Sequence, residues 1–111
     1  MGIFASNGSI EKNFSDSADT VRNAIEGLCR EQGHHLGTVS QDRSRYELNT
    51  KRTAMNWGTA IALTLAPSGS GTRVMIDYDN VDGSPKALLD GRKNTKTATK
   101  FADDLAANLQ G

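Results

Sequence analysis

The stretch WGTAIALTLAPSGSGTRVMIDYD, residues 57–79, decides the fold that the sequence predicts. In its first half Ile61 and Leu63 alternate with small residues, and in its second half Val74 and Ile76 alternate with largely polar ones. Successive side chains of a β-strand point to opposite faces, so an apolar residue at every second position indicates a strand with one buried face. The stretch therefore predicts two neighbouring antiparallel strands.

The segment between the two runs, residues 67–71, is rich in glycine and raises the alternative of a phosphate-binding loop. Such a loop leads into a helix, whose free N-terminal amides and dipole bind the anion. Here a second strand follows, and the Gly-Lys-Ser/Thr ending of a phosphate loop is missing. Glycine, serine and proline are residues that turns favour, so we expect a β-hairpin.

Two segments have the spacing of amphipathic helices. Residues 15–33 begin with polar side chains such as Ser17 that can accept hydrogen bonds from free amides, and Gly33 supplies the stop. Ser84 and Pro85 suit a helix start ahead of the last segment of the chain. We expect a terminal helix of about four turns, and its apolar face consists of Ala98, Phe101, Ala102, Leu105 and Leu109.

The remaining alternating segments complete the fold class. Residues 9–14, 36–40 and 45–50 predict three further strands, which gives the order β-α-β-β-β-β-α. The simplest architecture is an α+β fold, in which a single antiparallel sheet of about five strands carries both helices on one face. A chain of 111 residues fits one such domain, residues 1–111. The expected core consists of Phe14, Val21, Ile25, Leu28, Tyr46, Leu48, Ile61, Leu63, Val74, Ile76, Phe101 and Leu105.

Composition excludes several classes of protein. The 13 basic and 13 acidic residues cancel, so no overall field attracts nucleic acid or an anionic membrane. A single cysteine, Cys29, rules out a disulfide within the chain. No apolar run reaches the length of a membrane span, and the N-terminus lacks the pattern of a secretory signal. We therefore expect a cytoplasmic protein.

Some motifs carry a family resemblance. The hairpin segment PSGSGTRVMI resembles that of START and Bet v 1-like domains, in which a curved sheet grips a long C-terminal helix. Across residues 9–109 the chain also resembles small uncharacterised bacterial domains, on the strength of Trp57-Gly58 at a strand start and of Asp90 with Lys93-Asn94 at a helix entry. The resemblance implies a reduced helix-grip layout and no particular activity.

Residues of catalytic or metal-binding type are few. His34 and His35 are neighbours that point apart in a strand, and no further histidine completes a metal site. Cys29 lies on the apolar face of its helix, where burial makes a thiol inert. Asp77 and Asp79 share one strand face, where charged residues are ordinary and can pair with arginines across strands. We find no complete catalytic set, so we expect no enzyme, no cofactor and no bound metal.

A basic segment around the start of the last helix suggests anion recognition. Five basic residues there could contact phosphates of nucleic acid or lipid. No aromatic residue is interleaved to stack on bases, and acidic residues follow one turn later, so a solvated helix face is the preferred interpretation and nucleic acid is disfavoured. The candidate contacts are Lys86, Arg92, Lys93, Lys96 and Lys100.

The outward-facing residues of the central strand are unusually small. A solvated sheet face normally carries larger polar side chains, whereas small ones let another surface approach closely. The sequence therefore favours a non-enzymatic binding domain that associates with a protein partner or a second copy of itself. The candidate interface consists of Ala60, Ala62, Thr64, Ala66 and Met75.

A small apolar ligand held between the sheet and the last helix is the alternative, and it follows from the helix-grip resemblance. A domain of this size has little volume to spare for a cavity. The expected core residues Ile61, Leu63, Phe101 and Leu105 are large enough to fill that space.

Overall fold

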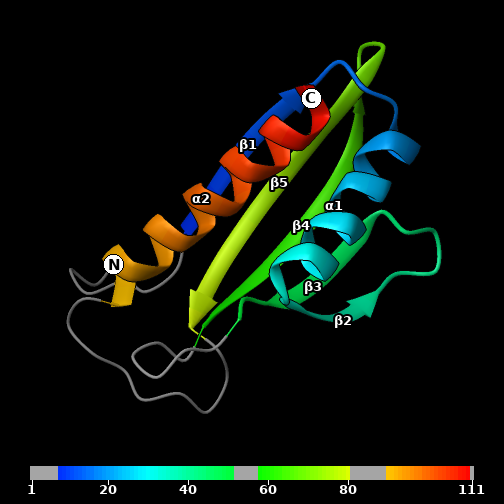
Figure 1. Ribbon diagram of the computed structural model, residues 1–111. Helices are drawn as coiled ribbons and strands as arrows, with labels where there is room; N and C mark the ends of the chain where they lie inside the picture. The colour runs from blue at the N-terminus through cyan, green and yellow to red at the C-terminus, as the bar shows by residue number, and fades with distance from the viewer. Residues whose placement is uncertain (1–7, 52–57, 81–89, 111) are drawn as a thin grey trace.

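The computed structural model describes residues 8–51, 58–80 and 90–110 (Figure 1). Five strands and two helices follow one another in the predicted order β-α-β-β-β-β-α, so the predicted α+β fold class is confirmed. The elements are β1 (Gly8–Phe14), α1 (Ala18–Gln32), β2 (His35–Val39), β3 (Arg45–Asn49), β4 (Thr59–Ser68), β5 (Gly71–Asn80) and α2 (Asp90–Gln110).

All five strands form one antiparallel sheet in the order β1-β5-β4-β3-β2. β2 to β5 follow one another as a meander, whereas β1 lies at the far edge against β5, with Ile10 opposite Ile76. The first and the last strands of the chain are therefore neighbours, and α1 with its connections carries the chain from one edge of the sheet to the other (Figure 1).

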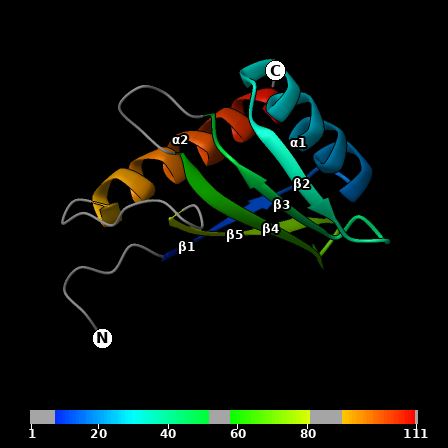
Figure 2. The ribbon, with the colours of Figure 1, turned by 90° about the horizontal axis from the view of Figure 1, so that it is seen from below.

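Both helices lie on the same face of the sheet (Figure 2). In the described part of the chain no element covers the opposite face, which we call the outer face. α1 begins where the Ser17 side chain accepts a hydrogen bond from the amide of Thr20, and it ends at Gly33, whose φ of 74° is left-handed. Both helix boundaries match the sequence prediction.

The core fills the space between the sheet and the helices. The predicted alternation is confirmed, because the inward residues of β4 and β5 are buried and the outward ones are half-buried or exposed. Phe14, which was expected in the core, is only partly buried at its border. The buried apolar residues are Val21, Ile25, Leu28, Cys29, Tyr46, Leu48, Ile61, Leu63, Leu65, Val74, Ile76, Tyr78, Ala98, Phe101, Ala102 and Leu105.

The hairpin that joins β4 to β5 is tighter than the predicted five-residue segment. Pairing extends to Ser68 opposite Gly71, so only Gly69 and Ser70 form the turn. Gly69 has a φ of 59°, which glycine adopts without strain. The segment turns the chain, as the sequence predicts, and leads into a strand.

The last helix is longer than the four turns that its apolar face predicts. It spans Asp90–Gln110, and near its start a buried polar residue contacts the sheet: Asn94 is 3% exposed and accepts a hydrogen bond from the Thr59 hydroxyl at 2.8 Å. Apolar periodicity cannot register such a contact. The short helical turn predicted to begin at Ser84 and Pro85, ahead of this helix, lies outside the described residues, as does Trp57.

Candidate functional site: the outer face of the sheet

The strand register arranges the outward side chains of β3, β4 and β5 in rows across the outer face. Ala62 on β4 lies between Asp77 on β5 and Glu47 on β3. One step along β4, Ala60 lies between Asp79 and Asn49. Each of these rows therefore has a short alanine at its centre and longer polar side chains on both sides.

A hollow of about 860 Å³ lies over these two alanines, and we call it the outer hollow. Ala60 and Ala62 form its floor, and Glu47, Asp77 and Asp79 stand around it. Asp77 is held in place by the hydroxyl of Ser9 on β1, which donates to its carboxylate. The outer hollow exists because methyl groups replace the long side chains that a solvated strand would carry.

The edge strand β2 closes one side of the outer hollow. A side chain at Gly37 would meet the Glu47 carbonyl oxygen at 3.2 Å, so glycine lets β2 lie close to β3. The pairing shifts register between Leu36 and Val39, and both of these apolar side chains are 37% exposed. β2 thus adds an irregular, partly apolar border to a mostly polar rim.

Charge changes sign along the strands of the outer face. Glu47, Asp77 and Asp79 line the outer hollow. Arg45 and Arg73 lie on the same two strands, β3 and β5, but outside the hollow on the side of Thr64 and Ala66. Arg45 contacts Glu47 at 3.3 Å and donates to the Thr64 hydroxyl at 3.1 Å. The Arg45 and Glu47 side chains are both about half exposed, so this contact leaves much of their charge facing solvent.

The space between the sheet and α2, where the alternative places an apolar ligand, is filled by side chains. Phe101 and Leu105 of α2 are 2% and 0% exposed, and they belong to the same buried cluster as Leu63 and Ile76 of the sheet, both 0% exposed. Near the start of α2, the Tyr78 hydroxyl contacts the Thr95 hydroxyl at 2.8 Å. Apolar packing and specific hydrogen bonds together join α2 to the sheet.

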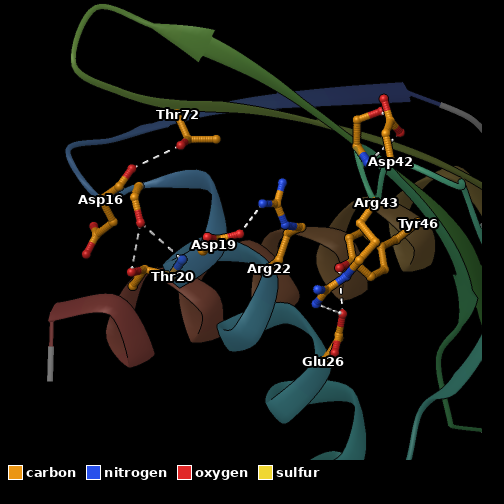
Figure 3. A network of polar contacts seen from close by, with 11 residues as sticks. Asp16, Asp19, Thr20, Arg22, Glu26, Asp42, Arg43, Tyr46 and Thr72 are labelled. Atoms are coloured by element: carbon orange, nitrogen blue, oxygen red, sulfur yellow. Dashed lines mark hydrogen bonds and ion pairs between the residues drawn. The ribbon is translucent and has the colours of Figure 1, made fainter.

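A polar network at the edge of the core fixes α1 against β3 (Figure 3). The buried Tyr46 donates its hydroxyl proton to Glu26 at 2.6 Å, and Arg43 pairs with the same carboxylate at 2.6 Å. These two hydrogen bonds lower the pKa of Glu26. Nearby, hydrogen bonds from Ser44 and Ser40 lower the pKa of Asp42 to about 2 and organise the turn before β3. This network therefore stabilises the turn before β3 and the contact between that turn, β3 and α1.

The two sequence candidates on α1 and at its end are tied into the core. Cys29 is buried, and burial raises the pKa of its thiol to about 11, so the thiolate required of a nucleophile is suppressed. The His34 ring accepts a hydrogen bond from the Lys51 amide and contacts Gln32, while the neighbouring His35 is exposed on the edge strand. The structure therefore separates the adjacent histidines.

The basic candidates form no enclosed site within the described residues. Lys93, Lys96 and Lys100 are exposed on α2, and Lys100 pairs with Asp104 at 2.7 Å. Arg92 lies within α2 but its side chain is outside the described set, as is Lys86 altogether. Among the described residues no group of three His, Cys, Asp or Glu is placed to hold a metal ion, and no described helix is long and apolar enough to cross a membrane.

Known structures share this architecture. Ara h 8.0201, a Bet v 1-like protein, superposes with a TM-score of 0.64 at 8% identity, over 95% of this chain and 98% of that one. The chain has a helix-grip-like fold. Protein MLL2253 from Mesorhizobium loti, a structural-genomics target, gives 0.58 at 13% identity over 93% of each chain. The predicted resemblance to Bet v 1-like and small bacterial proteins is confirmed.

A third helix-grip-like neighbour is an aromatase/cyclase-type protein. The di-domain ARO/CYC StfQ from the steffimycin biosynthetic pathway gives a TM-score of 0.56 at 8% identity, and this chain spans about half of it, 49%. The fold thus resembles Bet v 1- and START-like ligand-binding folds and polyketide cyclase-like folds. No protein-family model matches the sequence, and no curated protein matches it significantly. Identities this low establish the fold alone.

Sequence reasoning found the floor of the site and placed Asp77 and Asp79 on one strand face, but it missed the other walls. The row of small residues from Ala60 to Ala66, with Met75 beside Thr64, lies on the outer face as the alternation predicts. Glu47 and Asn49 border it only through the pairing of β3 with β4, and Ser9 reaches Asp77 only because β1 pairs with β5. No single-strand pattern carries this pairing information.

Proposed function

We propose that this chain is a non-enzymatic binding domain and that the outer face of its sheet binds a protein. The observation that supports this function is the position of the outer hollow, on the face that no described helix covers. Its floor of Ala60 and Ala62 lets a partner approach the backbone closely, and its polar rim supplies hydrogen-bonding groups. A catalytic role has no comparable support, because the nucleophile and base candidates Cys29 and His34 are tied into the core.

Binding of a small apolar ligand between the sheet and α2 is the alternative, and the helix-grip-like fold supports it. The side chains that meet there weigh against it. Phe101, Leu63 and Ile76 already occupy the space, and at least one of them must move before a ligand enters. The outer face needs no such rearrangement.

Site-specific photo-crosslinking in the cells that express the chain tests the proposal. A benzophenone side chain is introduced at position 62 in the outer hollow and, as a matched control, at the exposed position 96 on α2. We expect a discrete protein adduct from position 62 and none of that mass from position 96. The same adducts from both positions, or no adduct from position 62, would contradict the proposal.

A further inference from the structure

We infer that the protein bound by the outer face is a second copy of this chain, held antiparallel about a two-fold axis that runs across the strands between Ala62 and Thr64. This inference rests on the proposed function, because it names the partner of the same face. It follows from the charges of the outer face and from the symmetry that a pair of identical surfaces must obey.

The charges lie in a definite order along the strands. On β5 the outward residues run from Arg73 through Met75 and Asp77 to Asp79, so the basic and acidic ends are separated by the length of the strand. On β3 the adjacent outward residues are Arg45 and Glu47. On β3 and β5 the register places both arginines on the side of Thr64 and the carboxylates on the side of Ala62, whereas Glu11 of β1, opposite Met75, lies on the side of Thr64.

Two identical sheet faces can meet about an axis along the strands or about one across them. An axis along the strands places the acidic end of one sheet opposite the acidic end of the other. Carboxylates then face carboxylates, and this repulsion between like charges is unfavourable. An axis across the strands exchanges the ends. When it passes between Ala62 and Thr64, Arg45 lies opposite Glu47 of the second copy and Arg73 lies opposite Asp79.

The sizes of the side chains agree with the same axis. Along β4 it places Ala60 opposite Ala66 and Ala62 opposite Thr64, so small residues meet small ones where the two backbones are nearest. The long side chains of Arg45 and Arg73 then extend toward the acid-rimmed outer hollow of the second copy. Their aliphatic stems cover the alanine floor, and their guanidinium groups reach the carboxylates.

The available area fits a weak, reversible pair. Five strands about 4.8 Å apart and about seven residues long give a face of roughly 24 by 23 Å, or about 1,100 Å² over both copies. This lies near the lower limit of specific interfaces, for which we expect a dissociation constant of micromolar order. The chain has no net charge, so overall repulsion between copies does not oppose association.

The test is a charge exchange followed by native mass spectrometry at roughly 100 µM protein. R73E and D79K each place like charges in two symmetry-related contacts, so each variant alone is expected to lose roughly tenfold or more of its dimer affinity. In an equimolar mixture of the two variants every contact pairs opposite charges again. A heterodimer of intermediate mass should therefore form. The exposed helix variants K93E and E31K make the same charge changes away from the outer face and should dimerise like the wild type.

The outcomes separate this inference from the proposed function. A monomeric wild type overturns the second copy as partner, and a position-62 adduct of different mass then still supports the outer face. If A62R abolishes the dimer but both charge variants still form it, the antiparallel arrangement is overturned and the outer face remains the dimer interface. A dimer that also survives A62R lies on another surface and overturns the inference outright. If D79K does not fold, R73E and K93E are compared alone. Loss of the dimer in R73E but not in K93E supports the antiparallel arrangement, and equal dimerisation of the two variants overturns it.

Discussion

The two faces of the sheet carry the same alternation and differ in what lies over it. On the inner face of β4, Ile61 and Leu63 are buried in one cluster with apolar side chains of the helices. On the outer face of the same strand, Ala60 and Ala62 leave the outer hollow open. One strand therefore supplies both the closed core and the open surface, through a difference in the size of its alternate residues.

This contrast supports the proposed function on a face that the fold likeness alone does not suggest. The alternative of an apolar ligand concerns the space under the long helix, and there Phe101 and Leu105 are buried. Under the proposed function, stability and binding depend on opposite faces. Substitutions on the inner face should change the free energy of unfolding, and substitutions on the outer face should change association.

Phe101→Ala should produce the largest change in stability. It removes an aromatic ring that is 2% exposed and leaves a cavity, at a cost of about 3–5 kcal/mol in the free energy of unfolding. The matched outer-face variant Ala62→Arg should change it by no more than about 0.5 kcal/mol, because its long side chain extends into open space. Urea unfolding at equal protein concentration measures both. Comparable losses in the two variants would remove the distinction between the faces.

The same substitution at two threonines of β4 tests the polar contacts of each face. Thr59→Val deletes the hydroxyl that donates to Asn94 inside the protein, and it should cost about 1–3 kcal/mol because the buried amide oxygen loses this donor. Thr64→Val deletes an exposed contact with Arg45 that water can replace, so its effect should stay within about 0.5 kcal/mol. Thermal unfolding of the two variants gives the comparison, and equal shifts would contradict it.

The sequence predicts the composition of each face well, because alternation is a local property. Apolar residues such as Ile61 and Val74 at every second position indicate a buried strand face, and Ser17 and Gly33 mark where α1 begins and ends. Burial of one strand face accounts for the alternation, and short-range hydrogen bonds account for the helix boundaries: the Ser17 side chain accepts from the Thr20 amide, and the Gly33 amide donates to the Cys29 carbonyl.

Relations between distant segments could not be predicted in the same way. Nothing in residues 9–14 indicates that β1 pairs with β5, and the walls of the outer hollow depend on that pairing and on the one between β3 and β4. The contact of the first turns of α2 with the sheet includes Asn94, a buried polar residue whose partner Thr59 lies 35 positions earlier in the sequence. The candidate site could thus be predicted as a row of small residues but not as a hollow with an acidic rim.

Protonation of His34, at the border of the inner face, should make the stability of the fold depend on pH. Burial lowers the pKa of its imidazole, Lys100 lowers it further and Asp104 opposes them. The ring is held in the neutral form, because Nδ1 accepts the Lys51 amide proton at 3.0 Å and Nε2 contacts the Gln32 side-chain oxygen at 3.0 Å. Protonation would place a second proton against the Lys51 amide.

The sign of the effect follows from the direction of this shift. Unfolded histidine has a pKa of about 6.5, so below that pH the unfolded chain binds a proton more readily than the folded one. Stability should therefore decline as the pH falls from about 7.5 to 5.5, and His34→Asn, which does not titrate, should show a smaller decline. Parallel unfolding curves for the wild type and His34→Asn across this range would show that the ring does not couple α1 to the inner face in the way its contacts indicate.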